Sequence, residues 1–314
     1  MDWSEQRLGR HLKLRDLNVL LTVARCGSMG KAAAQLAVSQ PAISKAISEM
    51  EASLRVKLLD RSPRGVEPTI YARALLDRGL NAFDELRQAV QHIEFLADPT
   101  AGEVRIGSSL GTAISFVSVV IDRLAKRYPR IHFDLLTGDA TLTYRALAER
   151  KIDLLIARIF APVDEEHMQA EVLYEVRDVV TAAAQNPWTR RRRVKLADLV
   201  NVPWVLPPTD SLQGTIVAEA FRVSGLEVPR AAVITATVPV RNALLAGGRF
   251  LTIEPDSDLQ LPGTSPPLKR VAVNLPTTPR PIGIITLKHR TLGPTAQLFM
   301  DAARELARTL GKSK

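Results

Sequence analysis

The segment from Leu14 to Leu58 constrains the fold of this chain most, because it holds three helix-like patterns separated by two short turns. Between Arg15 and Arg25, apolar residues recur at spacings of three and four, which is typical of a helix with one buried face. Gly27 favours a helix end, and Ser28 and Ser39 have the hydroxyl side chains that cap the start of a helix. We therefore expect a compact unit of three helices.

The third helix, which opens with Ser39-Gln40-Pro41, has two different faces. Its apolar residues recur at helical spacing and must be buried: Ile43, Ile47, Met50 and Leu54. Beside them runs a polar stripe of Gln40, Ser44 and Ser48, with Lys45 closer to solvent. Gln pairs bidentately with adenine, and Ser bonds any base edge, so the stripe suits the major groove of DNA. A solvated helix face with capping serines is the alternative on periodicity alone.

Charge favours the DNA interpretation of this segment. Between Arg7 and Arg73 the sequence has twelve Lys or Arg and five Asp or Glu, so this part carries +7 of the net +9. A phosphate backbone rewards such a surplus through counterion release. The chain is otherwise of ordinary globular composition, with 46% hydrophobic residues, and its 314 residues suit about two domains. The single cysteine, Cys26, excludes an internal disulfide framework.

Two elements follow the three helices. Asp60 to Pro68 is a turn-rich basic loop that we interpret as a wing, with Arg61 and Arg64 towards phosphate or the minor groove. A surface loop in which Arg61 pairs with an acid is the alternative. From about Ile70 to Leu96 a long helix is expected, because apolar or small residues step by four and three in a heptad seam: Ala72, Leu76, Gly79, Phe83, Leu86, Val90, Ile93 and Ala97.

Such a seam needs a partner, which is either a second copy or the chain's own domain. Dimerisation is favoured, because a head that reads a two-fold DNA site needs two copies. Asp98 to Gly102 then breaks the helix. From Glu103 onward, strands near 104–107, 131–137 and 153–157 alternate with helices, which predicts a βαβαβ unit with a parallel sheet. A second such unit begins near Val176, and residues 282–310 return to the first. The two lobes so formed predict a small-molecule cleft.

These patterns together resemble one known family. The likeness rests on Ser28, Ala32, Ala33, Leu36, Ser39-Gln40-Pro41-Ala42-Ile43-Ser44, Ile47, Glu51, Leu54, Leu58, Arg61 and Thr69, and later on Tyr128-Pro129, Gly138-Asp139, Pro203 to Pro208 and Arg280-Pro281-Ile282-Gly283. Over nearly its whole length the chain resembles LysR-type transcriptional regulators. Leu59 departs from the pattern, since the family usually has Phe there. Residues 64–69 further resemble the subgroup of the galactose-binding protein regulator.

The resemblance implies a mixed α+β and α/β fold with a winged helix-turn-helix, a long linker helix and a two-lobed effector domain similar to type 2 periplasmic binding proteins. The expected boundaries are 1–69 for the DNA-binding domain, 70–97 for the dimerising linker helix, 98–102 for a hinge and 103–314 for the effector domain, with lobe 1 at about 103–175 and 283–314 and lobe 2 at about 176–282. The implied function is effector-controlled transcription regulation, as a dimer or homotetramer that reads an inverted repeat and contacts RNA polymerase.

Three groups of site residues are predicted. The DNA-binding group is Ser28, Lys31, Gln40, Pro41, Ser44, Lys45, Arg61 and Arg64. The dimerisation group is Leu76, Phe83, Leu86, Val90 and Ile93. By position after the strands, the effector-binding group is Ser108, Ser109, Thr137, Thr141, Ser211, Thr235 and Thr237. Hydroxyls and helix N-termini suit a carboxylate or a sugar, and helix capping is the alternative role for these residues.

Other classes of function find little support in the sequence. No nucleophile–base pair or nucleotide fingerprint is evident, so an enzyme is not expected, nor is a catalytic residue, cofactor or metal site. A solute-binding protein is the second hypothesis, but the basic head and the absence of an apolar h-region at the N-terminus argue against it. We expect a cytoplasmic protein without a membrane partner. Arg190 to Arg193 are interpreted as a solvated loop.

Overall fold

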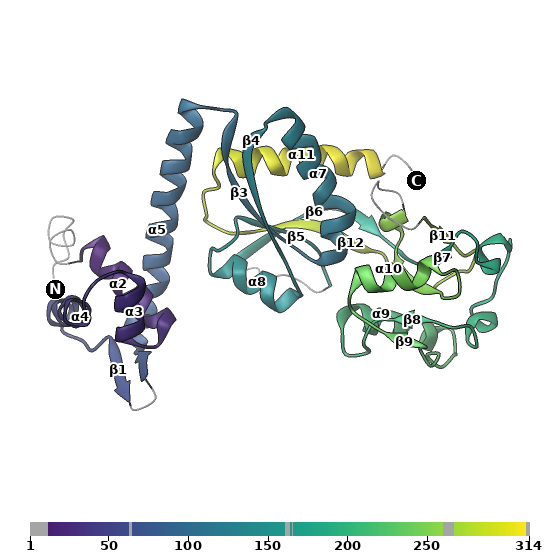
Figure 1. Cartoon of the computed structure of the whole chain (residues 1–314), viewed down its shortest axis with the longest axis horizontal. Helices are drawn as coiled ribbons and strands as arrows, with labels where there is room; N and C mark the ends of the chain where they lie inside the picture. The colour runs from purple at the N-terminus through teal and green to yellow at the C-terminus, as the bar shows by residue number, and fades with distance from the viewer. Residues whose placement is uncertain (1–11, 63–64, 161–163, 165, 260–266, 312–314) are drawn as a thin grey trace. The chain divides into compact units, whose positions relative to one another are not determined.

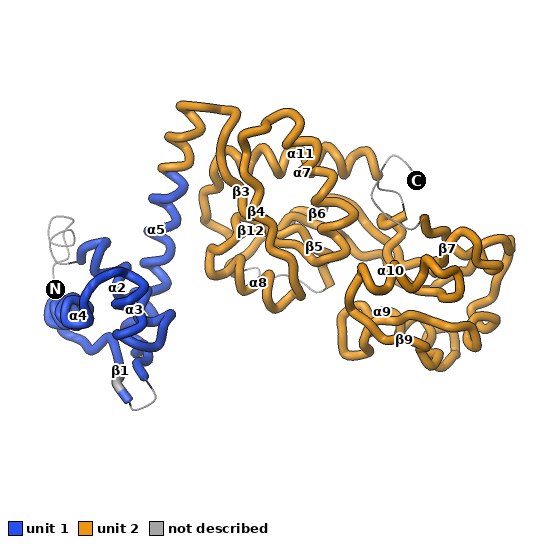
Figure 2. Tube along the Cα trace, viewed as in Figure 1, with its two compact units in different colours: residues 1–89 blue, residues 90–314 orange. Residues whose placement is uncertain are grey.

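The structure is a computed structural model that describes residues 12–62, 65–160, 164, 166–259 and 267–311 (Figure 1). The chain divides into two compact units, Met1–Ala89 and Val90–Lys314, drawn in blue and orange in Figure 2. Each unit has a hydrophobic core of its own. In the part of the chain that the structure describes, no helix is long and apolar enough to cross a membrane.

Three helices and a β-hairpin form the first unit, as expected. The helices are α2 (Leu14–Cys26), α3 (Met29–Gln35) and α4 (Gln40–Leu54). They are followed by β1 (Leu59–Ser62) and β2 (Gly65–Pro68), which pair antiparallel. The apolar faces of all three helices meet in one core, which explains why their apolar residues recur at helical spacing.

The turns between these helices follow the expected capping. Gly27 ends α2 in the left-handed conformation, with φ 62°. The Ser28 and Ser39 hydroxyls each accept a hydrogen bond from a backbone N–H at 3.4 Å. Helix α3 ends at Gln35, and two residues later Ala37 has φ 53°, which a right-handed helix does not allow.

The long helix α5 spans Ile70–Ala97, which is about 40 Å at 1.5 Å per residue. Its first turns belong to the core of the head: Ala72 is fully buried there and Leu76 packs against the same cluster. A Cβ on Gly79 would come within 2.9 Å of the Leu17 side chain, so glycine lets α5 lie close to α2. At Ala72 and Gly79 the partner of the seam is therefore their own head and not a second copy.

The second unit contains a five-stranded sheet in the order β4-β3-β5-β12-β6. Its strands are β3 (Ala101–Ser108), β4 (Arg130–Thr137), β5 (Leu154–Arg158), β6 (Met168–Val176) and β12 (Arg280–Leu287). As expected, β3 pairs parallel with β4 and β5. The sheet is mixed, however, because β12 runs antiparallel to β5 and β6. We did not expect β6, which is a mostly exposed edge strand without a clear apolar pattern.

Helices cover both faces of this sheet. They are α6 (Leu110–Thr112), the π-helical turn η1 (Ala113–Val117), α7 (Ser118–Arg127), α8 (Ala140–Ala148) and α11 (Pro294–Gly311). Apolar residues of α7 and α11 share one core with the strands, centred on the buried Phe116 and Phe299. Residues of α8 share a separate cluster with other positions of β5 and β12. The final helix thus returns to the first lobe, as predicted.

The second lobe is built around an antiparallel sheet, β10-β7-β11, and a parallel pair, β8-β9. Its elements are β7 (Asp178–Ala183), η2 (Pro187–Arg190), η3 (Leu196–Leu199), β8 (Val205–Leu206), α9 (Leu212–Val223), β9 (Val233–Ile234), α10 (Val238–Ala246), β10 (Thr252–Pro255), η4 (Asp256–Leu259) and β11 (Leu268–Arg270). Trp204 is fully buried here, and its ring meets Phe221 edge-on. The short edge strand β11 was not expected.

Candidate DNA-binding head and effector site

Helix α4 starts at the surface of the head with the residues predicted to read DNA. Ile43, Ile47 and Met50 are almost completely buried, and they fix the rotation of the helix about its axis. On the rest of the helix, Gln40, Pro41 and Lys45 are exposed and Ser44 is half-buried. The polar stripe therefore faces away from the core, which is the arrangement that a helix needs to enter a DNA groove.

The first turn of α3 lies beside the first turn of α4. A Cβ on Gly30 would lie 3.6 Å from Gln40 Oε1 and 3.8 Å from Ser28 Oγ, so these two predicted residues are neighbours. Lys31 is exposed one residue further along. The Lys45 ammonium lies 3.8 Å from the Glu49 carboxylate, and both side chains are exposed. Such a pair is weak, so Lys45 is available to a phosphate.

The predicted wing is the β1–β2 hairpin, in which Arg61 lies opposite Val66. The Val66 N–H donates to the Gly27 carbonyl at 2.9 Å, which ties the hairpin to the turn between α2 and α3. Gly65 has φ 128°, and a Cβ there would come within 2.7 Å of the Gly27 oxygen, so only glycine fits. The Arg61 side chain and the whole of Arg64 lie outside the described residues.

A half-buried carboxylate holds α4 to the start of the hairpin. Glu51 accepts hydrogen bonds from the Leu58 N–H at 2.9 Å and the Leu59 N–H at 3.4 Å, and it pairs with Lys57 at 2.6 Å. Burial by itself raises the pKa of Glu51, but these donors and the Lys57 charge hold it below its usual value. The carboxylate thus fixes the hairpin relative to α4, the helix predicted to read DNA.

In the second unit, the predicted hydroxyl residues after β3 and β4 have different environments. Ser108 is fully buried and donates to the Ile156 carbonyl at 2.8 Å, which links β3 to β5. Ser109 occupies the N-cap position of α6, but its hydroxyl donates to Thr112 at 3.0 Å. Thr137 and Thr141 are exposed, and Asp139, not Thr141, caps α8.

The hydroxyl residues of the second lobe are partly engaged as well. Ser211 caps α9, since its Oγ accepts from the Gly214 N–H at 3.0 Å. Thr235 Oγ1 accepts from the Thr237 N–H at 3.1 Å, and Thr237 is the N-cap residue of α10 without a capping side-chain bond. Helix capping, the alternative role, therefore accounts for Ser211 and not for Ser109 or Thr141.

A buried ion pair between the lobes was missed by sequence reasoning. Arg158, the last residue of β5, donates to Asp178, the first residue of β7, at 3.0 Å from Nη1 and 2.5 Å from Nη2. Gln213, in the first turn of α9, accepts from Arg158 Nη1 at 3.2 Å and donates to Asp178 at 2.9 Å. The sequence does mark Arg158, because a charged residue that directly follows four apolar residues stands at the end of a buried strand. Nothing in the neighbouring sequence marks Asp178 or Gln213.

A second polar cluster lies between α10, β10 and η4. Glu254 is buried, pairs with Arg241 at 2.7 Å and accepts from the Thr181 hydroxyl at 2.6 Å. Asp258 is also buried and accepts a hydrogen bond from the Ser257 hydroxyl at 3.4 Å. Burial, together with the charge of Glu254, raises the pKa of Asp258 to about 7. Two carboxyl groups thus share one arginine, which disfavours charge on both at once.

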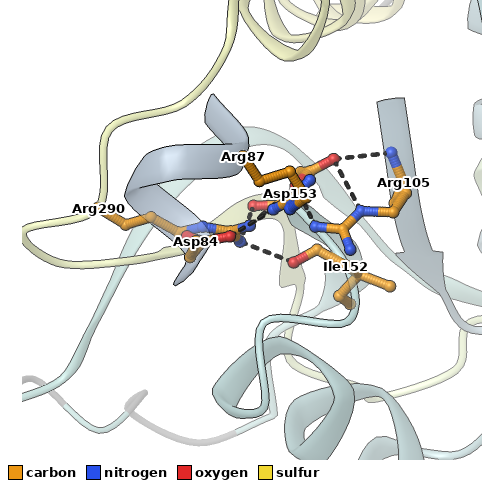
Figure 3. A network of polar contacts seen from close by, with 6 residues as sticks. All are labelled: Asp84, Arg87, Arg105, Ile152, Asp153 and Arg290. Carbon is orange, nitrogen blue, oxygen red and sulfur yellow. Dashed lines mark hydrogen bonds and ion pairs between the residues drawn. The ribbon is translucent and has the colours of Figure 1, made fainter. Parts of the chain in front are cut away.

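Figure 3 shows a third network, at the opposite end of β5 from Arg158. Asp153 accepts hydrogen bonds from the Arg105 N–H at 2.9 Å, from Arg105 Nη2 at 2.7 Å and from Arg290 Nη2 at 2.8 Å. Arg290 also donates to the Ile152 carbonyl at 2.7 Å. Although burial raises the pKa of Asp153, the arginine contacts hold it below its usual value. The network joins β3, β5 and the segment before α11.

The remaining predicted features are surface features. On α5, the seam residues Leu86, Val90 and Ile93 are exposed by 48%, 54% and 66%, which leaves apolar surface without cover. Arg190 to Arg193 are also exposed, in keeping with the solvated loop that we predicted, and the Arg191 guanidinium lies 4.1 Å from the centre of the Trp188 ring. Among the described residues, no group of three His, Cys, Asp or Glu side chains is placed to hold a metal ion.

Comparison with known protein families gives one match in each of the two compact units. Residues 14–73 match the family described as bacterial regulatory helix-turn-helix protein, lysR family, and residues 97–308 match the LysR substrate binding domain. The transcriptional regulator GbpR of Azospirillum brasilense is 30% identical over 96% of this chain and 89% of its own length. The dual regulator GltC of Bacillus subtilis (strain 168) is 26% identical over 92% of this chain and 96% of its own.

Solved structures of full-length regulators have the same fold. A full-length OxyR variant from Pseudomonas aeruginosa matches 94% of this chain and 95% of its own, with a TM-score of 0.66 and 18% identity. CbnR in complex with its target DNA matches 94% of this chain and 100% of its own, with a TM-score of 0.53 and 24% identity. The relatives are transcriptional regulators, not transport proteins. The chain therefore belongs to the LysR family of DNA-binding transcriptional regulators, with a C-terminal domain for a small-molecule effector.

Proposed function

We propose that two copies of the head read the two halves of an inverted-repeat promoter site, each with α4 in the major groove. The observation that carries this proposal is the polar stripe of α4, which the buried Ile43 and Ile47 hold away from the core. Gln40 reads a base edge, and Ser44 supplements it. The residues that position the head on phosphate and sugar are Ser28, Lys31, Pro41, Lys45, Arg61 and Arg64.

The long helix α5 supplies the second copy in this proposal. Leu86, Val90 and Ile93 are exposed at heptad spacing, with Phe83 half-buried at the next seam position, and such a stripe suits a partner helix. The proposed division is a DNA-binding domain at 1–69, a dimerising helix at 70–97, a hinge at 98–102 and an effector domain at 103–314. Dimers pair further into a tetramer, through which the protein bends DNA and contacts RNA polymerase.

The effector lies between the two lobes in this proposal, near the carboxyl ends of β3, β4 and β5, where α/β sheets bind ligands. The hydroxyl residues proposed to line it are Ser108, Ser109, Thr137, Thr141, Ser211, Thr235 and Thr237. Binding shifts the population between two arrangements of the oligomer, provided that the effector has a different affinity for each. The protein acts as a regulator and not as an enzyme, in the cytoplasm, where its DNA is.

A gel-shift experiment with the intergenic DNA upstream of its own gene tests this function. We expect a sequence-specific, salt-sensitive shift at nanomolar to micromolar protein. Gln40→Ala should lose about 1–3 kcal/mol of discrimination between operator and mutated operator, whereas Gln35→Ala, an equal deletion at an exposed end of α3, should not. Arg64→Ala should weaken binding to all sequences and reduce the salt slope by about one.

The two variants separate the roles of helix and wing. If Gln40→Ala and Arg64→Ala both bind operator DNA like the unmodified protein, the assignment of α4 and the hairpin as the DNA-contacting elements is wrong. If no specific shift is seen for the unmodified protein at low salt, the proposed operator is wrong.

A further inference from the structure

The edge of the sheet where an effector is expected carries one charged strand end. The parallel strands β3, β4 and β5 end at Ser108, Thr137 and Arg158, and of these three residues only Arg158 is charged. Its side chain is 5% exposed. A guanidinium buried at a ligand-binding edge needs an anion beside it, because a buried charge without a partner is strongly unfavourable.

In this structure the anion comes from the other lobe. The Asp178 carboxylate, 0% exposed, meets both Nη atoms of Arg158, and the Gln213 amide bonds both groups. Arg158 leads out of the first lobe's sheet, while Asp178 opens β7 and Gln213 lies in the first turn of α9 in the second lobe. The Asp178 carboxylate thus lies between a guanidinium and a side-chain amide, and both of these groups donate hydrogen bonds to it.

Asp178 does not satisfy this site completely. Of the five N–H groups of a guanidinium, those of Nη1 reach Asp178 and Gln213, and Nη2 reaches Asp178. The Nε atom is buried and has no hydrogen-bond partner among the residues that the structure describes. Nε and the adjacent Nη2 form the edge that binds a carboxylate with two parallel hydrogen bonds. The Arg158 guanidinium therefore has more hydrogen-bond donors than Asp178 uses.

A second arginine near Arg158 also favours an anionic ligand. The guanidinium groups of Arg158 and Arg280 lie 5.5 Å and 5.6 Å from the centre of the Phe160 ring. Arg280 donates to the Phe160 carbonyl at 3.0 Å. Asp178 is the carboxylate that pairs with Arg158, at 2.5 Å. Two guanidinium groups therefore lie near the Phe160 ring, and their positive charge favours an anion over a neutral ligand.

We propose that the effector of this domain is a carboxylate compound. Its carboxylate group takes the binding position on the Arg158 guanidinium, here called the seat, that Asp178 occupies in the absence of effector. This inference rests on the proposed effector site between the lobes and assigns its ligand class. Because Arg158 is buried under Asp178, the effector reaches it only when Asp178 withdraws. Binding therefore breaks the tie between β5 and β7 and selects another arrangement of the lobes.

Chemical rescue in the full-length protein tests the seat without knowledge of the effector. Asp178→Ala leaves the Arg158 charge buried without a partner, and we expect its melting temperature to fall by several degrees. Millimolar formate or acetate, compared with chloride at constant ionic strength, should restore at least half of that loss in a saturable manner. Asp210→Ala, which removes an exposed acid just before α9, should neither lose stability nor respond to formate.

Arg158→Gln combined with Asp178→Ala should abolish the rescue, because no guanidinium remains to bind the added carboxylate. If Asp178→Ala does not fold, Asp178→Asn, whose amide keeps one acceptor for Arg158, serves for the same comparison. A formate response that is absent in the Asp178 variant, or equal in the unmodified protein and both Asp178 and Asp210 variants, overturns the proposal.

A ligand screen by thermal shift, with mono- and dicarboxylates against neutral sugars, then addresses the effector class. We expect only carboxylates to shift the unmodified protein, and Arg158→Gln to weaken their binding at least about tenfold, as the loss of a charge-assisted hydrogen bond does. Stabilisation by a neutral sugar that survives Arg158→Gln contradicts the inference. The gel-shift experiment is independent of this result. A negative gel shift would refute the proposed DNA target but would not contradict the proposed carboxylate site.

Discussion

Asp258 carries a charge that the second unit tolerates poorly at neutral pH and above. It is 9% exposed, and burial and the charge of Glu254 raise the pKa of its carboxyl group to about 7. Arg241 is already paired with Glu254 at 2.7 Å, so it cannot fully neutralise a second carboxylate. Asp258→Asn removes the charge and keeps the shape of the side chain. We expect this variant to be more stable than the unmodified protein at pH 8.

The magnitude follows from the difference between the folded and unfolded pKa values. The ordinary value of the carboxyl group is 3.8, and the folded value is about 7. Since the folded state binds the proton more tightly, the stabilisation by Asp258 is complete below the unfolded pKa and is lost as the pH rises through the folded pKa. About three pKa units correspond to at most about 4 kcal/mol in total. Because part of this is already lost below pH 5, we expect Asp258→Asn to gain about 2–3 kcal/mol at pH 8 relative to pH 5.

Thermal unfolding at pH 5 to pH 8, followed by tryptophan fluorescence, measures this effect. Trp204 belongs to the core of the second lobe and Trp188 packs against it, so their signal reports the lobe that holds Asp258. For a unit of this size the gain corresponds to about 4–12 °C in the melting temperature at pH 8. Asp210→Asn, at an exposed position, is the matched control. Equal melting temperatures of Asp258→Asn and the unmodified protein at pH 8 would refute the reasoning.

Two other substitutions test the head and the long helix. Ile93→Asp places a charge on the exposed seam of α5 and should convert dimers into monomers in sedimentation experiments, with poor operator binding in gel shifts. The control His92→Asp, one residue away, should remain dimeric. If Ile93→Asp also remains dimeric, the seam is not the interface. Glu51→Gln removes the charge that binds the Leu58 N–H and Lys57 and should cost about 1–2 kcal/mol, seen as faster hydrogen exchange in α4. Glu49→Gln, at an exposed site, should exchange like the unmodified protein, and an equal effect of both variants would argue against the anchoring role.

Sequence reasoning succeeded where the cause of the structure is local. The Ser28 and Ser39 caps and the left-handed Gly27 were predicted because capping depends on residues within one helical turn. The buried face of α4 was predicted because helical periodicity reports which side a helix buries. The edge strands β6 and β11 were missed, since an exposed edge strand imposes no apolar pattern on its residues.

For the long helix, the sequence correctly predicted one element between residues 70 and 97 but not what each part of it touches. A seam of small and apolar residues looks the same whether it faces a second copy or its own head. Only the fold shows that Ala72 and Gly79 pack within the head, against the core and Leu17, while Ile93 is left exposed.

The same division applies to the proposed effector site. By itself the sequence determined that a basic three-helix head precedes an α/β domain, and that hydroxyl residues follow its strands, because composition and spacing are properties of short segments. Only the tertiary structure decided that Arg158 meets Asp178, 20 positions away, and Gln213, 55 positions away. The physical reason is that a buried charge selects its partner by distance and direction in space, and nothing in the intervening sequence records that choice.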